Sequence, residues 1–283
     1  MAKRILFIHG RGAQPPAALL GELWRQAVAV GFRRDAKDDL EVFESLTTDL
    51  FYFAHHATPV HKDMAQTEEQ LRDTIDLLAQ RKKSRDFRRR FYDELPGKSA
   101  LAEFAMDVAA STGFGRAAMQ KVAPEMELFW HDTQWREQVR SELVHWLGSH
   151  SNQDDELCIV SHCVGSVLLF DALAMQPADI RCLITMGSPL ADRVVRSRLP
   201  DSKQIRANID QWVNLSAEDD VMCHDKTLAD DYATLVETEQ VMQLTDHTIY
   251  NLALVDERSQ PSHWAGYLVH PRLIESLRNF MQE

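Results

Sequence analysis

The strongest constraint on the fold lies in residues 156–170, where one apolar run leads through a tight turn into another. Residues 157–161 are typical of a buried strand and residues 164–174 of a helix, with Cys163 at the turn between them. Ser161 and Gly165 stand two positions on either side, and only small residues there let a strand and a helix pass closely. We therefore expect a strained backbone at Cys163, which would lie at the carboxyl end of a sheet beside a helix N-terminus.

Strand and helix patterns alternate along most of the chain. The apolar runs predict strands at residues 3–9, 50–54, 157–161, 181–186 and 211–215, and helices at 17–30, 129–147, 164–174 and 271–281. This alternation is typical of an α/β protein with a doubly wound, mostly parallel sheet covered on both faces. No internal repeat or linker divides the sequence, so residues 1–283 are expected to form one domain.

The pattern changes between residues 61 and 126. This stretch is rich in charge, predominantly helical in character and poor in strand signals, and seven of the ten residues 81–90 are Lys or Arg. We expect a helical cap or lid insertion within the domain. Whether it moves as a lid, and whether its basic run is more than a solvated helix face, is left open by the sequence.

The turn at Cys163 resembles the nucleophile elbow of the α/β-hydrolase fold superfamily, Gly-x-Ser-x-Gly. Ser161 replaces the first glycine and Cys163 replaces the serine. In the second respect the chain resembles the dienelactone hydrolases, which use a Cys-His-Asp triad on this fold. The resemblance implies that Cys163 is the nucleophile. It also implies that the amide N–H of Val164, directly after it, forms half of an oxyanion hole.

The remaining triad members follow in the order nucleophile, acid, histidine that this fold requires. Asp220, in the acidic run after the strand at 211–215, matches the acid position best, with Asp219 as a second candidate. His263, in a loop before a helix near the C-terminus, matches the general base, and His247 is its competitor.

The loop after the first predicted strand supplies the other half of the implied oxyanion hole. His9-Gly10-Arg11-Gly12 resembles the His-Gly loop of the superfamily, and Arg11 N–H is the matching donor. The two glycines allow the backbone to approach a substrate oxygen closely. His9 is expected to be a structural residue of this loop, while the Arg11 side chain points either to an anionic substrate group or to solvent.

Composition narrows the classes of partner. The net charge of −12 argues against nonspecific nucleic-acid binding, because phosphates repel an acidic surface. The four cysteines form no CxxC pair, and no apolar run reaches the length of a signal peptide core or a membrane span, so a cytoplasmic location is expected. No dinucleotide or phosphate-loop fingerprint is present, and the histidines at 55, 56 and 61 lack a zinc-like set of partners, so no cofactor and no metal are expected.

These patterns predict a hydrolase that cleaves a carboxylic ester, thioester or lactone of a small acyl substrate through an acyl-Cys163 intermediate. Two alternatives remain at this stage. One is a binding protein of the same fold without catalysis; the other is a serine esterase or lipase-like enzyme whose nucleophile serine has been replaced by cysteine. The oligomeric state is not determined by the sequence.

Overall fold

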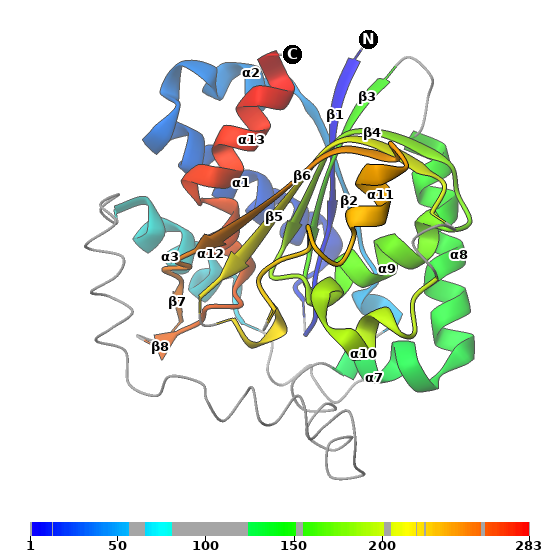
Figure 1. The fold of residues 1–283 in the computed structure, drawn as a ribbon. Coiled ribbons are helices and arrows are strands. Elements are labelled where there is room, and N and C mark those ends of the chain that lie inside the picture. The colour runs from blue at the N-terminus through cyan, green and yellow to red at the C-terminus, as the bar shows by residue number, and fades with distance from the viewer. Residues whose placement is uncertain are drawn as a thin grey trace.

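A computed structural model describes residues 2–12, 14–56, 66–80, 124–150, 155–200, 205–218, 220–223, 225–255 and 258–282. Six parallel strands form one sheet in the order β2-β1-β3-β4-β5-β6 (Figure 1). The strands are β1 (Ala2–Ile8), β2 (Thr47–Phe51), β3 (Asp155–His162), β4 (Ala178–Met186), β5 (Ala207–Ala217) and β6 (Val241–Ile249). The predicted α/β fold class is confirmed, and this sheet is parallel throughout.

Helices cover both faces of the sheet (Figure 1). One layer contains α1 (Ala17–Asp35), α2 (Leu40–Ser45), α3 (Glu68–Gln80), α12 (Trp264–Leu268) and α13 (Pro271–Gln282). The other contains α7 (Pro124–His131), α8 (Thr133–His150), α9 (Val164–Leu173), α10 (Arg193–Arg196) and α11 (Ala233–Glu237). A two-stranded antiparallel pair, β7 (Leu254–Val255) and β8 (Arg258–Ser259), lies outside the main sheet.

The alternation of side chains along the central strands divides the core into two apolar clusters. Ile5 and Phe7 of β1 pack in the cluster under α1, α12 and α13, whereas Leu6 and Ile8 pack under α8 and α9. The same division holds in β3, because successive residues of a strand point to opposite faces. Burial on both faces explains why these strands read as unbroken apolar runs in the sequence.

The crossing of α9 over β1 depends on Gly165. A β-carbon placed at this residue would lie 2.3 Å from the backbone oxygen of His9 and 2.9 Å from Cγ2 of Ile8. Both atoms belong to the end of β1 and the loop after it, which cannot withdraw without disturbing the sheet. The absence of a side chain at residue 165 therefore brings the N-terminus of α9 against this loop.

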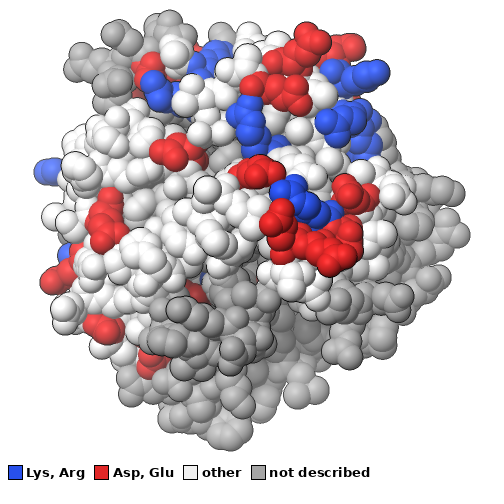
Figure 2. All heavy atoms as spheres, turned by 180° about the vertical axis from the view of Figure 1, so that it is seen from behind, with Lys and Arg blue, Asp and Glu red and all other residues white. Residues whose placement is uncertain are grey.

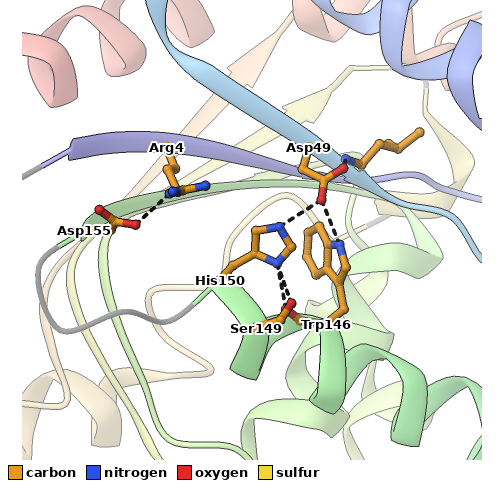
Figure 3. A network of polar contacts seen from close by, with 7 residues as sticks. Arg4, Asp49, Trp146, Ser149, His150 and Asp155 are labelled. Atoms are coloured by element: carbon orange, nitrogen blue, oxygen red, sulfur yellow. Dashed lines mark hydrogen bonds and ion pairs between the residues drawn. The ribbon is translucent and has the colours of Figure 1, made fainter.

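The C-terminal end of α8 is fastened to β2 by a polar network (Figure 3). His150 Nε2 lies 2.8 Å from the Asp49 carboxylate, and Trp146 Nε1 donates to the same oxygen over 3.2 Å. Beside it, Arg4 of β1 pairs with Asp155 at the start of β3 over 2.6 Å. The two contacts with Asp49 fix α8 relative to β2, the edge strand beside β1.

Two sequence predictions differ from the structure in this region. The single helix expected at residues 129–147 is interrupted at Asp132, because the Asp132 carboxylate accepts from the Trp135 N–H over 2.9 Å and begins a new helix, α8. Strand β6 had no counterpart in the prediction, because an edge strand with exposed and half-buried positions lacks a continuous apolar run.

Only part of the predicted insertion at residues 61–126 falls within the described chain. Its helix α3 packs against α1 and α12 in one helical layer, and its last residues begin α7. The basic run at 81–90 lies outside the described residues.

Charge is mixed on the face seen in Figure 2. Among the described residues of this face, acidic and basic side chains lie side by side, and no continuous basic stripe crosses it. Within the described chain, no helix combines the length and apolar character needed to cross a membrane.

The crossing at Gly165 predicts a stability difference between two glycine substitutions. Gly165→Ala is expected to destabilise the fold by about 2–3 kcal/mol, because the new methyl group overlaps backbone. Gly21→Ala in α1 serves as the control, since its β-carbon would meet only Leu50 at 3.8 Å and alanine favours a helix by up to about 1 kcal/mol. Urea unfolding measures both; equal midpoints for the two variants would contradict the close crossing.

Candidate active site

Cys163 occupies the turn between β3 and α9 in a backbone conformation that few residues adopt. Its φ of 52° and ψ of −124° fall in a region that costs about 1–3 kcal/mol for a residue with a side chain. Its N–H donates to the Met186 carbonyl over 2.8 Å, and its own carbonyl accepts from the Ser166 hydroxyl over 2.6 Å. The surrounding hydrogen bonds thus maintain the strained turn predicted from the small residues around Cys163.

Two backbone N–H groups lie near the Cys163 thiol. Those of Arg11, in the loop after β1, and of Val164, the first residue of α9, each lower the pKa of the thiol. Gly10 permits this approach, because a β-carbon there would lie 2.9 Å from Cβ of Cys163 and 2.4 Å from Nδ1 of His162. The two residues predicted to form an oxyanion hole therefore lie near Cys163, and their role as donors to a substrate oxygen stays a prediction.

Burial keeps the resting thiol protonated. Cys163 is only 1% exposed, and burial raises its pKa to about 12, although the Arg11 charge and the two amides act in the opposite direction. The nearby Asp220 carboxylate raises this pKa further. The sulfur is consequently a neutral thiol at pH 7.

The loop that carries His263 is tied to the turn at Cys163. His162, directly before the cysteine, contacts the Ser262 carbonyl through Nε2 over 3.1 Å, and Arg11 Nη2 donates to the Ser262 hydroxyl over 3.1 Å. The Arg11 side chain thus contacts the loop that precedes α12. These two contacts place His263, the next residue, near the loop after β1 and the turn at Cys163.

His263 begins α12 and points to Gln66. Its Nδ1 accepts from the Ala265 N–H over 3.1 Å, so in the neutral ring the proton is on Nε2, which lies 2.9 Å from Oε1 of Gln66. Burial lowers the pKa of His263 to about 4, which makes the ring neutral at pH 7. A general base at Nε2 needs the opposite tautomer, with the proton on Nδ1.

Asp220 is buried at the end of β5 but pairs with a residue other than His263. Its Oδ2 accepts from the Tyr267 hydroxyl over 2.7 Å and its Oδ1 from the Met222 N–H over 2.9 Å. Burial raises the pKa of Asp220, against the opposing effect of these two donors. Tyr267 follows His263 by four residues, so both belong to the same face of α12.

The structure therefore brings some of the predicted residues together and leaves others apart. Arg11, Val164 and Asp220 are all close enough to Cys163 to influence the pKa of its thiol. Among the described residues, no hydrogen bond joins His263 to Asp220 or to Cys163. Asp220 instead accepts a hydrogen bond from Tyr267, and His263 contacts Gln66.

The other candidate residues lie in different parts of the chain. Asp219 lies outside the described residues. His247 lies within β6, where it pairs in register with Leu215, and burial followed by the Arg272 charge lowers its pKa. His9 is structural as predicted: it contacts the Gly10 carbonyl over 2.7 Å and accepts from the Phe53 N–H over 2.9 Å.

Three residues of this site were not found from the sequence. Tyr267 could have been found, because a polar residue four positions after a helix-capping histidine shares its face. His162 and Gln66 had no such signal. His162 was assigned only to the turn, and Gln66 lies nearly two hundred residues before His263 in the chain. Among the described residues, the one group with metal-ligand spacing is His55, His56 and Glu142, and it does not include Cys163.

Comparison with known proteins does not identify an activity for this site. No protein-family model matches the chain, and no curated protein shows detectable sequence similarity to it. Among solved structures, an S-formylglutathione hydrolase from Agrobacterium tumefaciens aligns with a TM-score of 0.41 and 10% identity, over 99% of this chain and 84% of that one. A similarity of this size establishes neither a shared activity nor shared site residues.

The raised pKa of Cys163 predicts how its alkylation depends on pH. The rate of modification at Cys163, followed by peptide mass mapping after iodoacetamide treatment, should keep rising through about pH 8.5, the value for an ordinary cysteine. A resting thiolate–imidazolium pair would instead give a rate that levels off below about pH 7, and that result would contradict the buried neutral thiol.

Proposed function

We propose that this protein is an acyl-transfer hydrolase that cleaves a carboxylic ester, thioester or lactone through an acyl-Cys163 intermediate. One observation carries the proposal: a residue with a nucleophilic side chain occupies a strained turn, next to the loop after β1 and at the N-terminus of α9. Backbone strain of this kind persists only where surrounding structure imposes it, and paired amides are the usual means of stabilising an oxyanion.

The proposed reaction proceeds in two steps. His263 takes the thiol proton while the Cys163 sulfur attacks the carbonyl carbon, and the Arg11 and Val164 amides stabilise the oxyanion. The C–O or C–S bond to the leaving group then breaks, and the leaving group takes the proton from His263. A water molecule, deprotonated by His263, attacks the resulting thioester and releases the carboxylic acid and the free thiol. Each oxyanion donor contributes about 3 kcal/mol.

The resting arrangement is not the reactive one. Proton transfer from a thiol with a pKa of about 12 to an imidazole with a pKa of about 4 is unfavourable by roughly 10 kcal/mol. A reactive arrangement therefore requires His263 to leave Gln66 and donate from Nδ1 to Asp220, which raises the basicity of the ring. We propose that substrate entering the oxyanion hole accompanies this change, with Tyr267 giving up its contact to Asp220.

The same energetics favour activated acyl groups as substrates. Thiol esters, lactones and esters with acidic alcohols expel leaving groups that need little protonation, whereas an amide nitrogen must be protonated by a strong acid. Because burial lowers the pKa of His263 and raises that of the Cys163 thiol, the imidazolium that would have to protonate an amide nitrogen is costly to form. Esters, thioesters and lactones are accordingly preferred to amides as the substrate class.

A second candidate function is ligand binding without catalysis. It is favoured by the separation of Asp220 from His263 and by the near-complete burial of the thiol. A third reading, a serine enzyme with its nucleophile replaced, is compatible with the same backbone, since a serine hydroxyl would meet the same two amides.

Hydrolysis of short and medium p-nitrophenyl esters distinguishes these possibilities. Cys163→Ala and His263→Asn should each lose roughly 10³-fold or more in kcat/KM, and asparagine is chosen because it preserves the helix cap. His247→Asn is the matched control and should retain normal activity. A wild-type rate equal to that of Cys163→Ala would remove the esterase proposal and favour binding; a much faster Cys163→Ser variant would favour a serine-type site.

A further inference from the structure

Two histidines in consecutive positions lie apart from the proposed active site and face a single carboxylate. His55 and His56 belong to η2 (Ala54–His56), the short turn after β2, and Glu142 belongs to α8. The Glu142 oxygen Oε2 is 2.8 Å from Nε2 of His56 and 3.5 Å from Nε2 of His55. One ligand atom from each of the three side chains lies within 4.8 Å of the others.

The spacing of these atoms suits a small divalent cation. In a tetrahedral zinc site with bonds of about 2.0–2.1 Å, neighbouring ligand atoms are roughly 3.3 Å apart. The two measured separations, 2.8 Å and 3.5 Å, lie on either side of this value, and every pair of the three ligand atoms lies within 4.8 Å. Two histidines and one carboxylate form a ligand set that zinc favours.

The turn that carries the two histidines is held by neighbouring side chains. The Trp135 indole donates to the backbone carbonyl of His56 over 3.0 Å, and the Tyr52 ring lies parallel to that of His55 at 6.0 Å. Contacts around the ligands limit their movement and contribute to metal affinity.

Two of the three side chains already contact one another directly, because His56 Nε2 lies 2.8 Å from the Glu142 carboxylate. A cation at this place would replace the His56–Glu142 hydrogen bond with two stronger bonds to the same atoms.

We propose that His55, His56 and Glu142 form a zinc-binding site that joins the turn after β2 to α8. The site uses three protein ligands, leaves one tetrahedral position for water, and is only partly buried, with side-chain exposures of 52% for His55, 12% for His56 and 40% for Glu142. The sequence expectation of no metal considered only ligands close in sequence, whereas Glu142 comes from another element more than eighty residues away. His61, also in that sequence cluster, lies outside the described residues.

The proposed ion would stabilise the residues that pack against the loop after β1. The Tyr52 ring that stacks with His55 also packs against His9 at 5.2 Å, and His9 precedes Gly10 and Arg11. Zinc binding is thus expected to stabilise the fold by linkage, because the ligands are far apart in the unfolded chain.

Calorimetric titration of the reduced, full-length chain with ZnCl₂ tests the proposal. We expect one ion per chain and a loss of affinity greater than about 100-fold in Glu142→Gln and in His56→Ala, beyond the loss typical of an outer-sphere partner. His145→Ala is the matched control, because His145 is an exposed imidazole on the same helix and is not part of the cluster. Its affinity should equal that of the wild type.

A second measurement keeps the test independent of folding defects and of the cysteines. Co²⁺ bound to the wild type should show the visible absorption of a tetrahedral ion without the sulfur-to-metal charge-transfer band that thiolate ligands give. Glu142→Gln preserves the shape of the side chain, and its thermal unfolding without metal should match the wild type. Absence of zinc binding, or equal binding by Glu142→Gln, or a thiolate spectrum, would overturn the proposal.

Discussion

The close crossing of α9 over the end of β1 is the constraint on which the site depends. Gly165 lets the helix N-terminus approach the His9 carbonyl, and Gly10 lets the loop after β1 approach Cys163. Between these two contacts Cys163 turns sharply and takes a positive φ. The crossing therefore sets the position of Cys163 relative to the N-terminus of α9 and to the loop after β1.

A second level of organisation connects this turn with α12. His162 and Arg11 both contact Ser262, so the loop before α12 follows the position of the turn. Helix α12 in turn carries His263 to Gln66 and Tyr267 to Asp220. Helix α12 thus connects the proposed base and acid, yet each has another partner at rest. In the proposed reaction these partners are exchanged when substrate enters.

Much of the architecture could be predicted from the sequence because it depends on local and short-range patterns. Strands β1, β3, β4 and β5 are buried on both faces, so their apolar runs identify them, and the small residues around Cys163 identify the turn. Strand β6 was missed because it is an edge strand, and the break at Asp132 was missed because a single capping carboxylate decides it.

The candidate site was less predictable because its hydrogen bonds join residues far apart in the chain. The order Cys163, Asp220, His263 could be read from the sequence, but the tautomer of His263 depends on Ala265 and Gln66, and the partner of Asp220 is the Tyr267 hydroxyl. The cluster of His55, His56 and Glu142 was missed for the same reason, since its residues belong to η2 and α8, which meet only in the folded chain. Distances of this kind are set by the folded state, which no local pattern encodes.

The most direct test of the central proposal is the identification of the acylated residue. The protein is mixed with excess p-nitrophenyl acetate, quenched in acid within one turnover, and analysed by peptide mass mapping. One acetyl group is expected on Cys163, and neutral hydroxylamine should remove it, as it does from a thioester. Acetylation of another residue, or turnover of the ester with Cys163 never modified, would contradict it.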